Sequence, residues 1–370
     1  MGFTSQIKST IKRTAIYRST LESPFYRELR IFFSERSRFL NEAKRRFSDE
    51  HPAHGSYPDY KKAQWKHRVT YSEYMFSYEY WKLDEKQRDE FVSTSEMQCI
   101  YRKLGDSEVR EIFHDKTKFL KLFGKYVYRK WALAKDLSLD EFKEMIIASD
   151  CIAKPIDGTR GDGIFKVSAS EVNDWTSLWN ECKSKNVLLE ECIQECDELA
   201  SFHPSSLNTI RVVTISNKGK CAVFGALFRM GAHGSIIDNT HAGGIYAPIN
   251  IETGTIDIAA IDSHNNHYDS HPDTQKPIKG YRIPHWEEIV NTCKEATQTI
   301  PNIRFAGWDV CVNRAGHVEI IEGNHAPDFD GGMQAPLKVG VKKKVADTIK
   351  SIMNIDMLPL IKVYNNNPKI

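Results

Sequence analysis

A lysine followed by a glycine-rich stretch is the first feature of the sequence that could carry chemistry. The stretch runs from Lys154 to Val167, reads KPIDGTRGDGIFKV, and has glycines at Gly158, Gly161 and Gly163. Such glycines let a backbone fold tightly and point N–H groups at an anion, and the lysine adds a point charge for a phosphate. The stretch is neither a Walker A loop nor a helix-opening GxGxxG. It predicts a phosphate-binding loop, with a plain glycine-rich turn as the alternative.

Two acids and an amide form a second candidate group. Asp309 lies in one predicted strand, and Glu322 and Asn324 lie at the end of the next, across a short turn. These side chains can therefore converge at one edge of a sheet. Carboxylate and amide oxygens are hard ligands that suit Mg²⁺ shared with phosphates. Because a buried carboxylate needs compensation, the sequence predicts a magnesium site here, with a capped hairpin end as the alternative.

Two arginines interrupt strand-like runs that are otherwise apolar. Arg211 and Arg229 occupy these positions, and an arginine in such a setting indicates an anionic partner. The second run is followed by DNTHAGG at 238–244, which contains Asn239. We expect the two arginines to bind an anion.

Histidines and cysteines suggest no firm metal site. His264, His267 and His271 follow a spacing that could bind zinc, but the surrounding Asn, Ser and Pro residues also fit a polar turn network. The eight cysteines form no CxxC pair. They are expected to be reduced thiols packed in the cores of a cytoplasmic protein.

The elements that must position these residues can be read from periodicity and turn signals. Two hairpins are predicted, 208–216 with 220–229 and 304–312 with 317–322, and helices are predicted over 284–300 and 338–353. The first 110 residues are poor in glycine and favour helices, apart from a loop at 51–60 that contains two prolines. The aromatic run 71–81 is expected to pack in a helical core. This pattern predicts an α+β architecture with antiparallel sheets.

Composition excludes several classes of protein. The chain has 370 residues, of which 41% are hydrophobic and 27% charged, so it suits two or three globular modules. Its net charge of +2 is too close to neutral for a dedicated nucleic-acid binder. No apolar run is long enough for a membrane span, and the N-terminus lacks the apolar core of a signal peptide.

Taken together, these stretches resemble the ATP-grasp superfamily in order and spacing. The loop from Lys154 is similar to the phosphate loop of D-alanine–D-alanine ligases, and Asp115-Lys116 resembles the pair that supplies an ATP-contacting lysine. The segment 188–193 resembles the hinge that hydrogen-bonds adenine through its backbone. The resemblance implies nucleotide contacts from Lys116, Lys154, Gly158, Gly161, Gly163, Glu190, Glu191, Ile193 and, at the ribose, Asp197, and metal contacts from Asp309, Glu322 and Asn324.

A more specific resemblance covers residues 71 to about 336. The segments LLEECIQECDELASFHPSSLNTIRVVT, DNTHAGGIYAPIN and GWDVCVNRAGHVEIIEGNHAPD are similar to the sugar-transfer-associated ATP-grasp family. Residues 226–247 also resemble the ligases that add glutamate tails to a ribosomal protein. Two arginines that flank the asparagine in those ligases are Ile237 and Ala242 here, which argues against a shared glutamate substrate.

The resemblance implies an α+β ATP-grasp fold, in which two subdomains hold ATP between antiparallel sheets, with a helical N-terminal domain. We expect a helical region at 1–110, a first subdomain with the phosphate loop at 111–190, a second with the metal site at 191–345, and a helix and tail at 346–370. The resemblance leaves residues 1–70 unexplained.

The resemblance also implies an activity. ATP and two Mg²⁺ ions would serve a ligase that joins a carboxylate to an amine through an acyl phosphate. The catalytic residues that the resemblance implies are Arg211, Arg229 and Asn239. The partners would be a small-molecule or saccharide carboxylate and an amine, with peripheral association to surface-polysaccharide assembly machinery and no nucleic acid. The alternatives are a phosphotransferase acting on a hydroxyl and a non-catalytic nucleotide-binding partner of glycosyltransferases.

Overall fold

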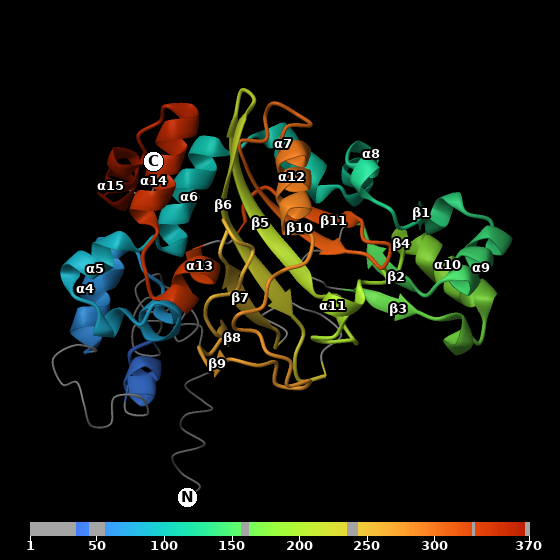
Figure 1. Cartoon of the computed structure of the whole chain (residues 1–370), viewed down its shortest axis with the longest axis horizontal. Coiled ribbons are helices and arrows are strands. Elements are labelled where there is room, and N and C mark those ends of the chain that lie inside the picture. The colour runs from blue at the N-terminus through green and yellow to red at the C-terminus, as the bar shows by residue number, and fades with distance from the viewer. Residues whose placement is uncertain (1–34, 44–55, 157–162, 235–242, 328–329, 367–370) are drawn as a thin grey trace, which may run out of the picture.

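The computed structural model describes residues 35–43, 56–156, 163–234, 243–327 and 330–366. Three parts follow one another across the molecule: a helical region, a large curved sheet, and a small lobe at the opposite end (Figure 1). The termini of the described chain both belong to the helical side. The α+β architecture with antiparallel sheets that the sequence predicts, with helices at its N-terminal side, is thus confirmed.

Short capped helices form the N-terminal region. Their bounds are α4 Tyr57–His67, a π-helical turn Glu73–Ser77, a 3₁₀ turn Tyr80–Lys82, α5 Glu85–Glu90, α6 Thr94–Leu104, α7 Ser107–His114 and α8 Lys116–Leu122. Capping boxes begin α5 at Asp84 and α6 at Ser93, which satisfies N–H groups that a helix leaves unpaired. The loop predicted at 51–60 was wrong at its end. Pro58 lies in the first turn of α4, where the missing N–H of proline costs no hydrogen bond.

The aromatic run at 71–81 lies in the core of this region, as predicted. Tyr74, Tyr78, Tyr80 and Trp81 are buried together with Phe39. The phenol of Tyr78 donates to the carbonyl of Val92, and that of Tyr80 donates to the carbonyl of Arg88. Buried tyrosines with satisfied hydroxyls make a packed core.

The small lobe is a four-stranded antiparallel sheet with helices against it. The strands are β1 Trp131–Leu133, β2 Cys151–Pro155, β3 Phe165–Val167 and β4 Val187–Glu191, in the order β1-β4-β2-β3. The helices are α9 Leu139–Ala148 and α10 Trp175–Ser184, with 3₁₀ turns at Ala134–Asp136 and Ala169–Glu171. Their apolar faces share a core with β2 and β4. Glycine-loop residues 157–162 connect β2 to the segment before β3 and lie outside the described residues.

The large sheet is also antiparallel and has the order β11-β10-β5-β6-β7-β8-β9. Its strands are β5 Thr209–Asn217, β6 Lys220–Met230, β7 Ile245–Ile249, β8 Ala260–Ile261, β9 His267–Tyr268, β10 Phe305–Val312 and β11 Val318–Asn324. Both predicted hairpins are confirmed as β5–β6 and β10–β11. Lys218 and Gly219 take left-handed backbone angles at the first turn, the geometry that a two-residue hairpin turn requires.

Helices cover the two faces of the large sheet. Helix α12 Trp286–Thr297 lies on one face. The remaining helical elements are α11 Asp197–Ala200, a 3₁₀ turn Gly124–Tyr126, α13 Asp330–Leu337, α14 Lys342–Met353 and α15 Met357–Asn366. Helices α13 and α14 pack against β6 from the side of the helical region (Figure 1). The proposed boundary at 345 falls inside α14, and the one at 190 falls one residue before the end of β4; the subdomain limits stay a prediction.

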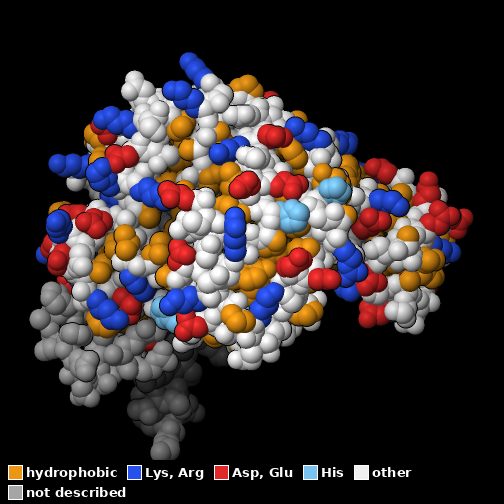
Figure 2. All heavy atoms as spheres, in the orientation of Figure 1, with side chains coloured by type: hydrophobic (Ala, Val, Ile, Leu, Met, Phe, Trp, Pro, Cys, Tyr) orange, Lys and Arg blue, Asp and Glu red, His pale blue; other side chains and the backbone are white. Residues whose placement is uncertain are grey.

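The surface carries no broad patch of one charge on the face shown in Figure 2. Basic and acidic side chains alternate across it, with acidic groups frequent over the small lobe. This mixture agrees with the net charge of +2 and gives no basic stripe for nucleic acid on this face. Among the residues described, no helix is long and apolar enough to cross a membrane.

Candidate active site

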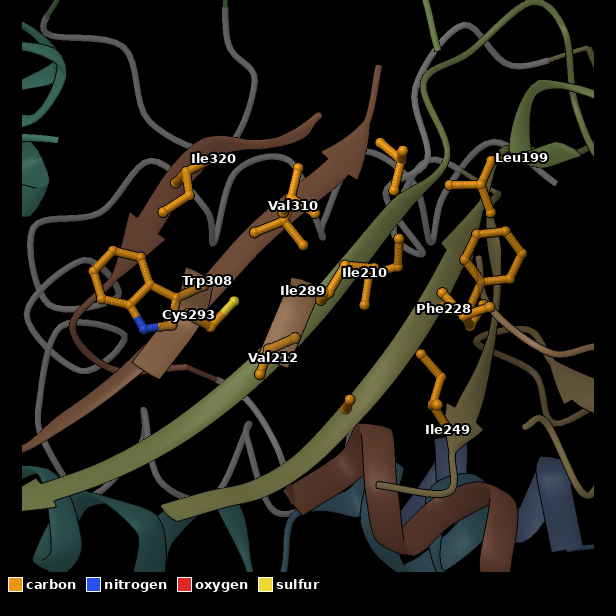
Figure 3. Packing of buried hydrophobic residues seen from close by; sticks show 14 of the residues in the cluster. Leu199, Ile210, Val212, Phe228, Ile249, Ile289, Cys293, Trp308, Val310 and Ile320 are labelled. Atoms are coloured by element: carbon orange, nitrogen blue, oxygen red, sulfur yellow. The ribbon is translucent and has the colours of Figure 1, made fainter. Parts of the chain in front are cut away.

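Alternation along β5 and β10 separates the core from the candidate site. Ile210 and Val212 point into the core beneath α12, next to Trp308 and Val310 (Figure 3). Because successive side chains of a strand point to opposite faces, Arg211 and Asp309 emerge on the other face. They are also direct partners in the β10–β5 register, so the pairing of these two strands brings this arginine and this acid together.

A β-bulge brings Glu322 to the same face. Asp309 pairs with Glu322, but the next residue, Val310, pairs with Ile320, so Ile321 is an extra residue in β11. Ile320 is buried in the core. Without the bulge, Glu322 would follow Ile320 to the core face, because residues two apart share a face. Asn324, two residues further along, returns to the face of Glu322.

The carboxylate of Asp309 is held by two guanidinium groups. Arg211 Nε donates to Asp309 Oδ1 in a short contact, and Arg211 Nη2 lies 2.7 Å from Oδ2. Arg229 Nη1 lies 3.1 Å from the same Oδ2. Burial alone would raise the pKa of Asp309, which is only 3% exposed, but the two arginines hold that pKa well below its usual range.

Glu322 responds in the opposite direction. Desolvation among the strands and repulsion by the Asp309 carboxylate both raise the pKa of Glu322 above its usual value. Because the Glu322 side chain is exposed, repulsion by Asp309 is the main cause of the raised pKa. A divalent cation between the two acids would relieve it. Asn324 Oδ1 accepts one hydrogen bond, from the Ala326 N–H at 2.9 Å, and an amide oxygen has a second lone pair. The assignment of Asp309, Glu322 and Asn324 to magnesium stays a prediction.

Two lysines lie near the start of the glycine loop, one on the small lobe and one on helix α8. Lys154 on β2 forms a short ion pair with Glu190 on β4. Lys116 begins α8 directly after its N-cap, Asp115, and its Nζ donates to the carbonyls of Pro155 and Ile156 at 3.2 Å each. Glu190 also binds Arg129, which donates to the carbonyls of Ile320 and Ile321 on β11. Lys154 is thus linked through two side chains to the strand that carries Glu322.

The rest of the glycine loop is only partly described. Gly163 has a left-handed φ of 73°, the conformation that glycine adopts most easily. Gly158 and Gly161 lie outside the described residues, as does Asn239 in the 238–244 segment. The roles of these three residues stay predictions.

The predicted hinge is held by its own backbone. The Glu191 N–H donates to the Lys130 carbonyl at 2.9 Å, and the Cys192 N–H donates to the Asp150 carbonyl at 2.8 Å. These bonds occupy two of the hinge N–H groups, so an adenine contact is expected at Ile193. Asp197, at the start of α11, is exposed, and its carboxylate lies 3.8 Å from the Arg314 guanidinium. The contact between Asp197 and the ribose stays a prediction.

The histidine cluster forms a polar turn network. His271 is buried, with Nε2 2.7 Å from the Gly231 carbonyl oxygen, and its Nδ1 accepts from the Asp273 N–H at 3.3 Å. His264 and His267 are exposed. The described part of the chain contains no group of three or more His, Cys, Asp or Glu side chains able to hold a metal.

One residue of the site had no signal in the sequence. Arg129 is buried, and its guanidinium contacts both Glu190 of the small lobe and Glu319 of β11. The partners lie 61 and 190 residues away along the chain. An arginine in a run of basic and aromatic residues is unremarkable without these contacts, so only the fold could identify it.

A glycine on β10 gives a testable packing requirement. A Cβ at Gly307 would lie 2.5 Å from Pro327 Cβ and 3.2 Å from Arg211 Cδ. We expect Gly307→Ala to lower the free energy of unfolding by about 1–3 kcal/mol, as overpacking does, and to displace Arg211. Thermal unfolding would measure the loss. The matched control is Gly124→Ala, where nothing lies within 4 Å of the added carbon; equal stability of the two variants would contradict this packing.

Two antiparallel sheets, one that carries Lys154 and one that carries Arg211, Asp309 and Glu322, agree with the ATP-grasp architecture that the sequence resemblance implies. The family model described as sugar-transfer associated ATP-grasp matches residues 95–350. The chain belongs to this family, as its sequence suggested.

Solved structures of ATP-grasp proteins are similar at low identity. The ATP-grasp ligase PsnB complexed with minimal precursor is 14% identical over 68% of this chain and 64% of that chain, with a TM-score of 0.43. The L-amino acid ligase from Bacillus licheniformis is 12% identical over 63% and 48%, with a TM-score of 0.37. A biotin carboxylase from Campylobacter jejuni is 12% identical over 69% and 46%, with a TM-score of 0.39.

The chain spans less than two-thirds of the length of these three proteins. No curated protein matches it. At this identity and TM-score, the similarity does not establish the activity of this chain.

Proposed function

We propose that the protein is an ATP-dependent ligase that joins a carboxylate to an amine through an acyl phosphate. The observation that carries the proposal is the arrangement of charges between the lobes. Lys154 on the small sheet pairs with Glu190, which Arg129 links to the backbone of β11, and Asp309 on the neighbouring β10 binds Arg211 and Arg229. Cations for phosphates and acids for a metal are thus combined with guanidiniums suited to a carboxylate.

In this proposal the small lobe binds the nucleotide. Lys116, Lys154 and the glycine loop hold the triphosphate, and the hinge at Ile193 contacts the base. Asp309, Glu322 and Asn324 hold Mg²⁺, which we propose as two ions, and bound Mg²⁺ neutralises charge on the phosphates. Asp309 and Glu322 are direct partners in the β10–β11 register, which supports this assignment.

The arginines orient the reacting groups. A substrate carboxylate oxygen attacks the γ-phosphorus, ADP leaves, and an acyl phosphate results. The amine nitrogen then attacks the acyl carbon, and phosphate leaves with the oxygen that came from the carboxylate. Arg229 and Arg211 would hold the carboxylate and stabilise charge on its oxygen, with Asn239 on the acceptor side. Arg229 lies on the strand that leads to the 238–244 loop, which supports this placement.

We further propose a saccharide or amino-acid carboxylate as the substrate, within surface-polysaccharide assembly in the cytoplasm. The description of the family, which associates it with sugar transfer, supports a saccharide. Uronic acids of surface polysaccharides offer carboxylates that an amine can convert to amides. The support for this finer proposal is analogy with the family.

Hydroxylamine trapping tests the reaction class. Purified protein would be incubated with ATP, Mg²⁺ and hydroxylamine, against a panel of uronic acids and amino acids. An acyl phosphate predicts a hydroxamate, with ADP and phosphate released together. If no member of the panel gives a hydroxamate and ADP accompanies a stable phosphoester, the enzyme is a phosphotransferase instead.

Lys154 gives the corresponding test of nucleotide binding. We expect Lys154→Ala to raise the Kd for ATP about 10- to 100-fold, because a charged hydrogen bond contributes about 1.5–3 kcal/mol. Calorimetry would measure the Kd. The control is Lys166→Ala, which removes a lysine of the same sheet that pairs with Asp150. Normal ATP affinity in Lys154→Ala would show that the glycine-rich stretch is a plain turn and not a phosphate-binding loop.

A further inference from the structure

Arg129 lies where the chain enters the small lobe, between the 3₁₀ turn Gly124–Tyr126 and β1. Its side chain is buried, and it faces a carboxylate on each side. Arg129 Nη2 lies 2.6 Å from Glu190 Oε1 on β4, and Arg129 Nη1 lies 2.9 Å from Glu319 Oε1 on β11. One guanidinium therefore links the two sheets that enclose the proposed nucleotide site.

The link to β11 includes the backbone at the bulge. Arg129 Nη1 donates to the Ile320 carbonyl at 3.0 Å, and Nη2 donates to the Ile321 carbonyl at 3.1 Å. Ile321 is the extra residue that turns Glu322 to the site face. Glu319 is fixed in turn, because its Oε1 also accepts the Arg129 N–H at 3.0 Å. Arg129 is thus bound by several hydrogen bonds to β11, the strand that carries Glu322 and Asn324.

On the β4 side, Glu190 connects Arg129 to Lys154, the lysine proposed to bind phosphate. Glu190 is 3% exposed; it gives Oε1 to Arg129 and Oε2 to Lys154. Burial would raise the pKa of Glu190, but Lys154 and Arg129 lower it to about 2. The buried Arg129 and the partly buried Lys154 therefore balance the carboxylates of Glu190 and Glu319. Buried charges of this kind hold a fixed geometry, because moving one leaves another unpaired.

We propose that Arg129 is a positioning residue that sets Lys154 for the phosphates of ATP, acting through Glu190 and using β11 as its anchor. The guanidinium fork keeps the phosphate lysine in register with the strand that carries Glu322. This inference rests on the proposed nucleotide site. Lysine cannot replace Arg129, since an ammonium lacks the planar fork that reaches two carboxylates and two carbonyls together.

A double-mutant cycle on ATP binding tests the inference. The Kd for ATP would be measured by calorimetry in EDTA for the wild type, Arg129→Lys, Lys154→Ala and the double variant. We expect Arg129→Lys to raise the Kd about tenfold. In the double variant the Kd should stay within about twofold of Lys154→Ala, because the group that Arg129 positions is already gone.

The matched control is Arg88→Lys. Arg88 is buried in the helical region and grips Asp59 with both Nη atoms, at 2.9 and 2.8 Å, but it has no described contact with the site. Arg88→Lys should lose thermal stability as Arg129→Lys does, and keep wild-type ATP affinity. If Arg129→Lys does not fold, Glu319→Gln replaces it in the cycle, with an expected two- to threefold loss of affinity.

The outcomes separate this inference from the proposed function. Normal ATP affinity in Arg129→Lys, or losses that add fully in the double variant, would overturn the positioning role while leaving the nucleotide site in place. Normal affinity in Lys154→Ala would remove the nucleotide site itself, and the role of Arg129 with it. A tenfold, non-additive loss supports both.

Discussion

Replacing Asp309 with asparagine is expected to lower ATP turnover by at least about 100-fold. The carboxylate is the common partner of Arg211 and Arg229, and it is proposed to hold the metal. An asparagine keeps the shape but removes the charge, so one strong electrostatic stabiliser is lost, and such losses cost about 10²–10³ in rate. Initial rates of ADP formation at saturating ATP would measure the effect. Glu322→Gln should give a loss of similar size.

Asp59→Asn is the matched control for the loss of a carboxylate that binds a guanidinium. Asp59 receives both Nη atoms of Arg88, as Asp309 receives a fork from Arg211. The control should lower thermal stability but leave turnover per folded molecule unchanged. Wild-type turnover in both Asp309→Asn and Glu322→Gln would refute the metal assignment.

The second large effect is expected at Arg229. In Arg229→Lys, hydroxamate formation should fall by about 100-fold, because an ammonium cannot copy the bidentate grip of a guanidinium on a carboxylate. ATP affinity serves as the internal control and should change by less than about threefold, since Arg229 is placed on the acceptor side. The trapping assay and calorimetry give the two values on the same sample. Hydroxamate formation at the wild-type rate would show that Arg229 does not bind the substrate.

Much of the large sheet was predictable because its signals are local. Alternating apolar residues and a glycine-containing turn located the β5–β6 hairpin to within one residue at each strand. The same alternation made Arg211 and Asp309 conspicuous, because a charged residue interrupts an apolar strand. Local patterns of this kind are written in neighbouring residues, and sequence reasoning reads them well.

Other features depend on pairing across the fold. The spacing of Asp309 and Glu322 suggested a shared site, but the bulge at Ile321 that turns Glu322 away from the core has no local signature. The bridging role of Arg129 depends on partners that only the packed lobes bring together. At Pro58, by contrast, the sequence did hold the answer: a serine N-cap directly precedes the first turn, and proline is favoured at such a start.

Transfer of an oxygen isotope tests the central claim most directly. Once trapping identifies a carboxylate substrate, it would be labelled with ¹⁸O in its carboxyl group and incubated with ATP, Mg²⁺ and the amine. An acyl-phosphate ligase predicts one ¹⁸O in each phosphate released, because the bridging oxygen of the intermediate leaves with phosphorus. Released phosphate without ¹⁸O, or a label retained in a stable phosphoester, would contradict carboxylate activation by this protein.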